Sequence, residues 1–323
     1  MIERASFIYS VKCNLKCRMC RLWKIKSNQT MSQDLIFHTI DELKKIDIKE
    51  VVLSGGELLL NPPLLYAAVK KLTDYNIKVF LITNGIYLSS DITENLANLG
   101  IKQIMVSVDG PKGVHNFLRG KGVFEKVITN LRALIKLKKT KRINIEIATT
   151  TVICNRNLNY LEDFTRFLEA LGVELVEFQP LNLALGAFNI NSFKTQKTIF
   201  REIGIKKRDL SGLKLCLKKL RSIKSQRPNL VGNSLDYFEI MEEYFAKSKL
   251  PFVCYVNKNS LGINWKGEVF FCFHKKPIGR LTLKKSLLEI INPKTTIARV
   301  KEIRNCEEKC IGFNHQPHFE NYE

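Results

Sequence analysis

Residues 5–20 read Ala-Ser-Phe-Ile-Tyr-Ser-Val-Lys-Cys-Asn-Leu-Lys-Cys-Arg-Met-Cys, a short apolar run with three cysteines close behind it. The run over residues 5–9 has the length and composition of a buried strand. Other apolar runs along the chain are followed by glycine and polar residues in the same way. These further strand-like runs cover residues 50–53, 78–82, 103–108, 143–149 and 175–178.

Helical patterns separate the strand-like runs, at residues 33–45, 63–75, 91–99, 124–138 and 159–171. Strands and helices that alternate at this spacing predict βαβ units on a parallel sheet, joined by right-handed crossovers. Six strands, with no sign of two more, predict an α/β fold built on a partial (β/α)6 barrel over residues 1–180. In such barrels the functional residues lie on the loops that follow the strands. The three cysteines stand on the first of these loops.

The pattern changes after Pro180. Residues 181–191 read as a linker, and helices are expected near residues 211–223 and 236–247. Residues 261–265 and 269–273 predict two strands around a turn, followed by helices near residues 285–291 and 296–303. We therefore predict a linker and helical segment over residues 181–250. A smaller C-terminal α+β domain, a hairpin plus helices, is predicted over residues 251–323.

The composition is that of an ordinary globular protein, with 45% hydrophobic and 26% charged residues in a chain of 323. The sequence contains no run of 18 apolar residues, so we expect no membrane span. The first residues lack the charged-then-apolar pattern of a secretory signal, so we expect a cytoplasmic location. Nine cysteines in a reducing compartment indicate metal or redox chemistry rather than disulfides.

The formal net charge of +21, from 52 Lys and Arg against 31 Asp and Glu, is typical of a nucleic-acid-binding protein. The basic residues are nevertheless spread over most of the expected helices. No basic tract interleaves with aromatic residues as in a known RNA-binding motif. A Lys-rich solvated surface is therefore the default interpretation, and RNA, an acidic peptide or an anionic substrate remains a weaker alternative.

The first three cysteines, Cys13, Cys17 and Cys20, can hold one inorganic centre. A structural zinc ion needs four ligands, and the nearest further candidate is His38. A [4Fe–4S] cubane is usually held by four cysteines. With three cysteines, one iron keeps an open position that can bind a substrate or cofactor directly.

A loop Cys13-x3-Cys17-x2-Cys20 after the first strand of a partial barrel resembles the signature of the radical S-adenosylmethionine (radical SAM) enzymes. The resemblance covers roughly residues 4–180. It implies a [4Fe–4S] cluster whose open iron chelates SAM, and reductive cleavage of SAM to a 5′-deoxyadenosyl radical that abstracts hydrogen from a substrate. The position before the third cysteine is commonly aromatic in the family, and here it is Met19, which is apolar and adaptable enough for the same contact.

The same resemblance assigns a SAM pocket to the loops after the next strands. Gly55-Gly56-Glu57 matches the motif that binds the SAM amino group, and the two glycines let the backbone approach a ligand closely. Asn84, at the end of the third strand, is expected at the ribose. Ser107 and Arg119 are expected to hold the ribose and the carboxylate.

Other polar residues at strand ends carry no assignment beyond this. For Asp109 and His115, a role in the pocket and a role as turn-forming and capping residues fit the sequence equally well. Residues 149–151 and Gln179 face either the pocket or their own neighbours in the sheet.

Four cysteines fall in the C-terminal region: Cys254, Cys272, Cys306 and Cys310. Four ligands close either an iron–sulfur cluster or a zinc site completely, and composition does not decide between the two. The element Cys254-x12-Gly267-x4-Cys272 resembles the opening of the SPASM and twitch domains of radical SAM enzymes, which implies one auxiliary [4Fe–4S] cluster. Its expected role is to take an electron from the substrate radical.

The remaining cysteines and histidines receive other interpretations. Cys216 reads as ordinary helix packing, whereas Cys154, just after the fifth strand, is a weaker candidate for a catalytic thiol. His315 and His318 read as tail residues rather than ligands.

The predicted function is thus a radical SAM oxidoreductase or maturase that abstracts hydrogen from a peptide, a sugar or a cofactor precursor. A flavodoxin or ferredoxin is the expected electron donor. The alternative is a zinc-dependent nucleic-acid-binding protein that uses the same cysteines and the basic surface. A non-catalytic iron–sulfur carrier does not explain three cysteines without a fourth nearby.

Overall fold

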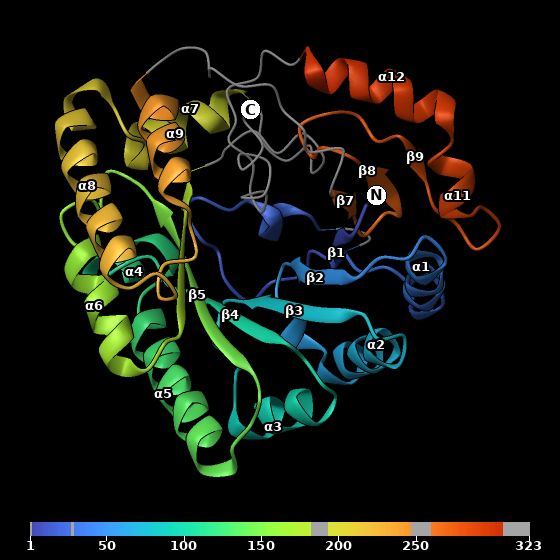
Figure 1. The fold of residues 1–323 in the computed structure, drawn as a ribbon, viewed down its shortest axis with the longest axis horizontal. Coiled ribbons are helices and arrows are strands. Elements are labelled where there is room, and N and C mark those ends of the chain that lie inside the picture. The colour runs from blue at the N-terminus through green and yellow to red at the C-terminus, as the bar shows by residue number, and fades with distance from the viewer. Residues whose placement is uncertain (1, 27–28, 182–192, 247–259, 306–323) are drawn as a thin grey trace.

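The computed structural model describes residues 2–26, 29–181, 193–246 and 260–305 of the 323-residue chain. Its centre is a curved sheet with helices around the outside (Figure 1). Six parallel strands lie in sequence order, each paired with the next. They are β1 (Arg4–Ser10), β2 (Glu50–Gly55), β3 (Lys78–Thr83), β4 (Gln103–Ser107), β5 (Glu146–Ile153) and β6 (Leu175–Pro180). The predicted α/β partial barrel is confirmed.

Helices cover the outer face of this sheet (Figure 1). They are α1 (Gln33–Lys45), α2 (Pro62–Asp74), α3 (Ser90–Asn98), α4 (Lys112–Arg119), α5 (Val123–Lys141) and α6 (Leu161–Leu171). Ser32, Asn61 and Ser89 cap α1, α2 and α3 by accepting a backbone N–H bond. The apolar sides of these helices and the outward side chains of the strands form one buried core, whose burial is the main favourable term in folding.

The C-terminal strands continue the same sheet. Strand β7 (Ser260–Ile263) pairs in parallel with β1, with Arg4 opposite Ser260. Strands β8 (Glu268–Phe270) and β9 (Gly279–Arg280) follow antiparallel. The predicted hairpin therefore forms, and it extends the barrel sheet at its β1 edge.

The second half of the chain adds helices near both edges of this sheet (Figure 1). They are α7 (Phe193–Ile203), α8 (Leu210–Gln226), α9 (Leu235–Ala246), α11 (Leu287–Ile290) and α12 (Pro293–Arg304). Short 3₁₀ helices span Leu22–Lys24, Leu58–Leu60 and Lys207–Asp209. The buried carboxylate of Glu42 in α1 accepts the backbone N–H of Leu287 at 2.8 Å, which ties α11 to the barrel.

Two described helices lie outside the predicted set, α4 and α7. Most of the predicted linker lies outside the described residues. None of the helices in the described ranges is long and apolar enough to cross a membrane.

Candidate functional site

A cavity of about 300 Å³ lies at the carboxyl ends of the parallel strands. Cys13, Cys17 and Cys20 line one part of it, although they belong to a single loop after β1. The ends of the five other parallel strands, β2 to β6, and the end of α4 line the rest. Among these residues are Ser54, Gly55, Gly56, Thr83, Asn84, Ser107, Val152 and Gln179 of the strand ends, and Arg119 of α4.

Hydrogen bonds hold the cysteine loop to its surroundings. The backbone N–H of Arg18 donates to the carbonyl of Leu118 at 2.8 Å, and the Arg18 side chain donates to the carbonyl of Phe117. The indole N–H of Trp23 donates to the carbonyl of Cys20 at 2.9 Å. The contacts of Arg18 tie the cysteine loop to the C-terminal end of α4, and the contact of Trp23 closes the loop after Cys20.

Cys17 is buried, and Cys13 and Cys20 are half-buried. Burial raises the pKa of Cys13 to about 11 and that of Cys20 to about 12. Burial also raises the pKa of Cys17, and the nearby Arg119 guanidinium opposes that rise. Cys17 also raises the pKa of Cys13, and Cys17 and Cys13 both raise the pKa of Cys20, so the three lie within electrostatic reach of one another.

This donor set fits a cubane. Within the described ranges, no three His, Cys, Asp or Glu side chains surround a single ion position. A cubane takes each thiolate at a different iron, so three cysteines around one cavity provide a matching arrangement. Thiolate sulfur is also the ligand type that iron–sulfur clusters select.

The glycines of the Gly-Gly-Glu loop make close contacts with the backbone around the cysteine loop. A Cβ added to Gly55 would lie 2.1 Å from the carbonyl oxygen of Ser10, and one added to Gly56 would lie 2.1 Å from that of Lys12. Gly55 also has a φ of +143°, which side chains rarely adopt. The two glycines therefore let the end of β2 press against the start of the cysteine loop.

Glu57 lies behind the cavity and is only 1% exposed. Its carboxylate accepts hydrogen bonds from the Thr83 hydroxyl at 2.9 and 3.0 Å and from the Asn84 backbone N–H at 2.8 Å. It also accepts the backbone N–H of Leu59 at 3.1 Å. Burial raises its pKa, and these bonds oppose the rise. Glu57 thus joins the ends of β2 and β3.

Asn84 and Ser107 line the cavity, as the sequence predicts. The Asn84 amide donates to the side-chain oxygen of Asn14 at 2.8 Å, and its nitrogen lies 4.0 Å from the sulfur of Cys13. Ser107 ends β4 and is 8% exposed. Both side chains are therefore available to a ligand beside the cysteines.

Arg119 also lines the cavity, and Asp109 holds it there. Its guanidinium donates to the Asp109 carboxylate at 2.6 and 3.3 Å. Asp109 is fully buried, and it accepts the backbone N–H of Val152 at 3.0 Å. Burial alone would raise the pKa of Asp109, but the guanidinium outweighs it and lowers that pKa. The imidazole of His115 accepts the backbone N–H of Asp109 at 3.2 Å.

Sequence reasoning missed Arg21, which lines the cavity directly after the third cysteine. Its Nε is buried and has no hydrogen-bond partner within the described residues. A buried donor left without a partner is costly, so this nitrogen is placed for an anionic or carbonyl group of a ligand. The sequence feature that could have indicated Arg21 is a basic residue directly after Cys20, the third cysteine of the loop.

Met19 and Phe273 add apolar surface to the cavity. Met19 lines the cavity beside the cysteines, as the sequence predicts. The sequence did not predict Phe273, which directly follows Cys272 in the chain. The C-terminal hairpin therefore brings one of its cysteines close to the wall of this cavity.

Cys272 is partly buried and accepts the backbone N–H of His274 at 3.4 Å. The other three predicted auxiliary ligands, Cys254, Cys306 and Cys310, lie outside the described residues, as do His315 and His318. Whether the four cysteines meet therefore remains a prediction.

Cys154 and Cys216 are buried away from the cavity. Cys154 packs in a small apolar cluster with Leu118, Leu181 and Ile199, and burial raises its pKa to about 12. Cys216 belongs to the main core. Neither environment favours a reactive thiolate.

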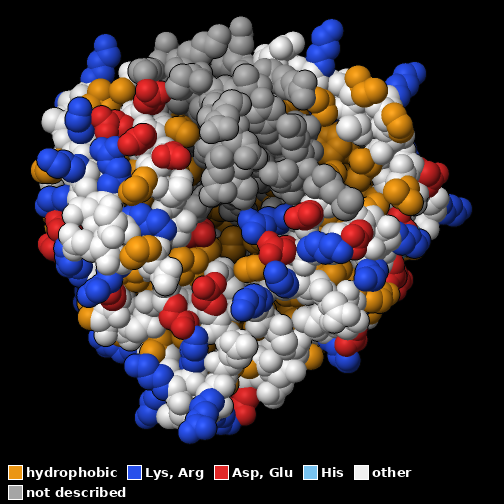
Figure 2. Space-filling view, viewed as in Figure 1, with side chains coloured by type: hydrophobic (Ala, Val, Ile, Leu, Met, Phe, Trp, Pro, Cys, Tyr) orange, Lys and Arg blue, Asp and Glu red, His pale blue; other side chains and the backbone are white. Residues whose placement is uncertain are grey.

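Charge is distributed unevenly around the cysteine loop. Residues 4–33 contain seven Lys or Arg and no Asp or Glu. Lys16 and Lys24 are exposed and lie 5.9 and 5.6 Å from the ring centre of Trp23. On the face drawn in Figure 2, Lys and Arg lie both along the margins and near the centre, with Asp and Glu among them.

Two family models match the chain. One, described as the Radical SAM superfamily, matches residues 7–168. The other, SPASM, described as an iron–sulfur cluster-binding domain, matches residues 254–311. These descriptions favour iron over zinc at both groups of cysteines.

Curated proteins match part of the chain. An AdoMet-dependent heme synthase of Methanosarcina barkeri is 34% identical over 161 residues, 49% of this chain and 43% of that protein. Mycofactocin maturase MftC of Mycobacterium tuberculosis is 27% identical over 165 residues, 50% of this chain and 41% of that protein. This chain thus spans about half the length of these relatives or less.

Solved structures match over almost the whole chain. SuiB of Streptococcus suis, bound to precursor peptide SuiA, has a TM-score of 0.69 at 14% identity and covers 96% of this chain and 72% of that one. The protein anSMEcpe with bound AdoMet has a TM-score of 0.67 at 18% identity, over 94% and 84% of the two chains. At these identities the likeness shows the shared fold alone.

Proposed function

Because this chain belongs to the radical SAM superfamily and carries a SPASM-type iron–sulfur region, we propose that it cleaves SAM reductively and abstracts hydrogen from a substrate. The observation that carries the proposal is the convergence of Cys13, Cys17 and Cys20 on one cavity with the ends of the five other parallel strands. When bound and reduced, the cluster and SAM supply the 5′-deoxyadenosyl radical. The protein supplies positioning and protection from side reactions.

The cavity residues divide the work of holding SAM. Cys13, Cys17 and Cys20 are proposed as ligands of the cluster. Gly55 and Gly56 set the position of the β2 end beside the cysteine loop. Asn84 and Ser107 are proposed to contact SAM directly.

Arg119 and Glu57 have different parts in this proposal. Arg119 offers a guanidinium to the SAM carboxylate while Asp109 keeps its orientation. A buried guanidinium suits a carboxylate because the hydrogen bonds are charge-assisted. Glu57 acts from behind, by holding the ends of β2 and β3 together, and its partners Thr83 and Asn84 face the cavity.

The C-terminal region is proposed to carry one auxiliary [4Fe–4S] cluster on Cys254, Cys272, Cys306 and Cys310. Residues 251–323 would form this unit, with residues 181–250 between it and the barrel of residues 1–180. Support comes from the iron–sulfur domain match and from the contact of Phe273 with the cavity. The proposed role of this cluster is to take an electron from the substrate radical.

The substrate is proposed to be a peptide or a cofactor precursor. The proteins that resemble this chain include a heme synthase and a mycofactocin maturase, and SuiB was solved with a precursor peptide. The unpartnered Arg21 nitrogen favours a substrate that brings an anionic or carbonyl group into the cavity.

A flavodoxin or ferredoxin is proposed as electron donor. Basic residues and the absence of acidic ones over residues 4–33 would speed encounter with an acidic partner. Reversing the charge of exposed Lys16 and Lys24 should slow reduction by a flavodoxin at low salt without slowing reduction by dithionite. Lys139→Glu, at the far end of α5, is the matched control and should leave both rates unchanged.

Cluster assignment is tested by counting iron after anaerobic reconstitution. Cys17→Ser should remove about four irons, because it takes one ligand from the barrel cluster. Cys154→Ser, also at a buried cysteine but outside the cavity, should remove none. Equal iron in both variants and the parent protein would rule out the cysteine loop as the cluster site.

A further inference from the structure

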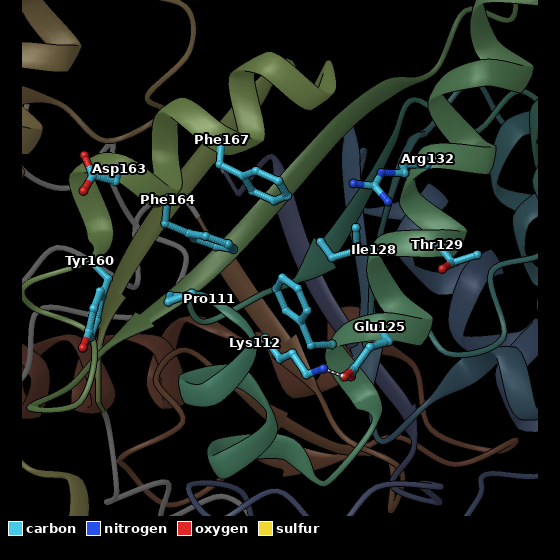
Figure 3. A pocket seen from close by; sticks show the side chains of 11 residues that line it. Pro111, Lys112, Glu125, Ile128, Thr129, Arg132, Tyr160, Asp163, Phe164 and Phe167 are labelled. Carbon is cyan, nitrogen blue, oxygen red and sulfur yellow. Dashed lines mark ion pairs between the residues drawn. The ribbon is translucent and has the colours of Figure 1, made fainter.

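A second pocket opens in the outer wall of the barrel, away from the cysteines. It has a volume of about 660 Å³ and lies among α4, α5 and α6 (Figure 3). This volume is within the range of sites that bind small molecules. Nothing in the proposed chemistry uses this pocket.

The pocket exists because α5 and α6 splay apart. α5 packs against α3 and α4, and α6 packs against α8. Near the C-terminal ends of α5 and α6 the gap is closed, since a Cβ on Gly172 would lie 3.0 Å from Ile135. Toward their N-terminal ends the helices diverge, and the pocket fills the space between them.

Aromatic rings from both helices line this space. Phe164 and Phe167 of α6 stack with ring centres 5.7 Å apart. Phe124 of α5 also lines the pocket, and the rings of Phe164 and Phe167 point into the space between α5 and α6 (Figure 3). Phe167 is 37% exposed and Tyr160 is 49% exposed. An exposed group of large apolar side chains around a hollow is typical of a binding site.

The charges around the pocket leave one cation without a partner. Lys112 is neutralised by Glu125 at 2.7 Å. Asp163 points away from the rings (Figure 3). The guanidinium of Arg132 extends toward the rings, and within the described residues it has no hydrogen bond or ion pair. The pocket therefore combines an apolar body with one free positive charge at its side.

We propose that this pocket, the α5–α6 pocket, is a second ligand site that takes a small organic acid with a flat apolar body. The rings would cover the apolar part, and Arg132 would pair with the carboxylate. A guanidinium is well suited to this because it presents two parallel N–H donors. The residues that line this pocket and those that line the cysteine cavity do not overlap. The ring centres of Phe124 and the buried His115 lie 5.9 Å apart.

The test uses two probes of similar shape, 1-naphthoate and the uncharged naphthalene-1-methanol, titrated calorimetrically into the reconstituted full-length protein at low salt. We expect naphthoate to bind about threefold more tightly or better, the size of a partly exposed ion pair. Arg132→Gln should abolish this preference. Lys126→Gln, an equal loss of charge on the same helix outside the pocket, should preserve it. Phe167→Ser should weaken both probes.

Thr129→Glu gives a second approach, since it places a carboxylate at the pocket and should repel naphthoate alone. Thr129, Arg132 and Phe167 are exposed, so circular dichroism should show folded variants. The proposal is overturned if neither probe binds, if both bind equally to the parent protein, or if Arg132→Gln and Lys126→Gln have the same effect.

Discussion

Replacing Asp109 by Asn separates two roles of one buried pair. Asp109 is fully buried, and the Arg119 side chain is 11% exposed. The substitution keeps the shape of the side chain but leaves a buried guanidinium without its counter-charge. Breaking a buried pair from one side costs about 3–5 kcal/mol. The Val152 N–H also loses a charged acceptor.

This loss should be visible in thermal unfolding. At about 2 °C or more per kcal/mol for a domain of this size, Asp109→Asn should lower Tm by about 6 °C or more. Asp74→Asn is the matched control, because its pair with Lys70 is exposed on the surface of α2. Tm of that variant should stay within about 2 °C of the parent value.

The same variant should also weaken SAM binding, because Arg119 loses the group that orients it. Equilibrium dialysis of the reconstituted protein measures this, and Arg119→Lys gives the companion variant that keeps charge but not the two parallel donors. A Tm for Asp109→Asn as high as that for Asp74→Asn would refute the reasoning about burial. An unchanged Kd for SAM would refute the positioning role.

Four further outcomes follow from single contacts. Gly56→Ala should destabilise the protein by about 1–3 kcal/mol and reduce iron incorporation, because a Cβ there meets the cysteine-loop backbone; unfolding midpoints and iron counts measure this. Glu57→Gln should cost about 1–3 kcal/mol in chemical unfolding, since an amide nitrogen cannot accept the hydrogen bonds that the three donors Leu59, Thr83 and Asn84 make to the two carboxylate oxygens. Glu42→Gln should lower stability by a similar amount and increase proteolysis near α11, where the Leu287 N–H loses a charged acceptor. The Tm gap between parent and Asp109→Asn should be constant above pH about 5 and narrow below pH about 4, because the folded pKa of Asp109 lies below its unfolded value.

The sequence predicted the barrel well because its signals are local. Each strand is a short apolar run, and each predicted helix of the barrel has an apolar stripe or a clear cap. The cysteine loop and the glycines stand directly after strands, so topology alone brings Cys13, Gly55 and Ser107 to one end of the sheet. These expectations agree with the cavity as observed.

What the sequence could not show depends on pairs far apart in the chain. Asp109 and Arg119 are ten residues apart, and only the fold of α4 brings them into contact. The helix itself was missed because it is short, starts after a proline and contains Gly113. The Glu57 carboxylate is held in its buried position by the hydroxyl of Thr83, 26 residues away in the chain.

The C-terminal hairpin was also only partly predictable from the sequence. Its turn was predicted from the sequence, and Gly267 in that turn has a φ of +77°. Its partner strand was not predicted, because the pairing of β7 with β1 spans most of the chain. Periodicity predicts a strand, and it carries no information on which edge that strand joins.

The central claim is reductive cleavage of SAM at the cysteine loop, and one anaerobic measurement tests it directly. Reconstituted protein is mixed with SAM and dithionite, and 5′-deoxyadenosine is measured by chromatography. We predict that it forms in the parent protein and in Cys154→Ser and is absent in Cys17→Ser. No 5′-deoxyadenosine from a parent protein that holds about eight irons, or equal amounts from Cys17→Ser, would contradict the account.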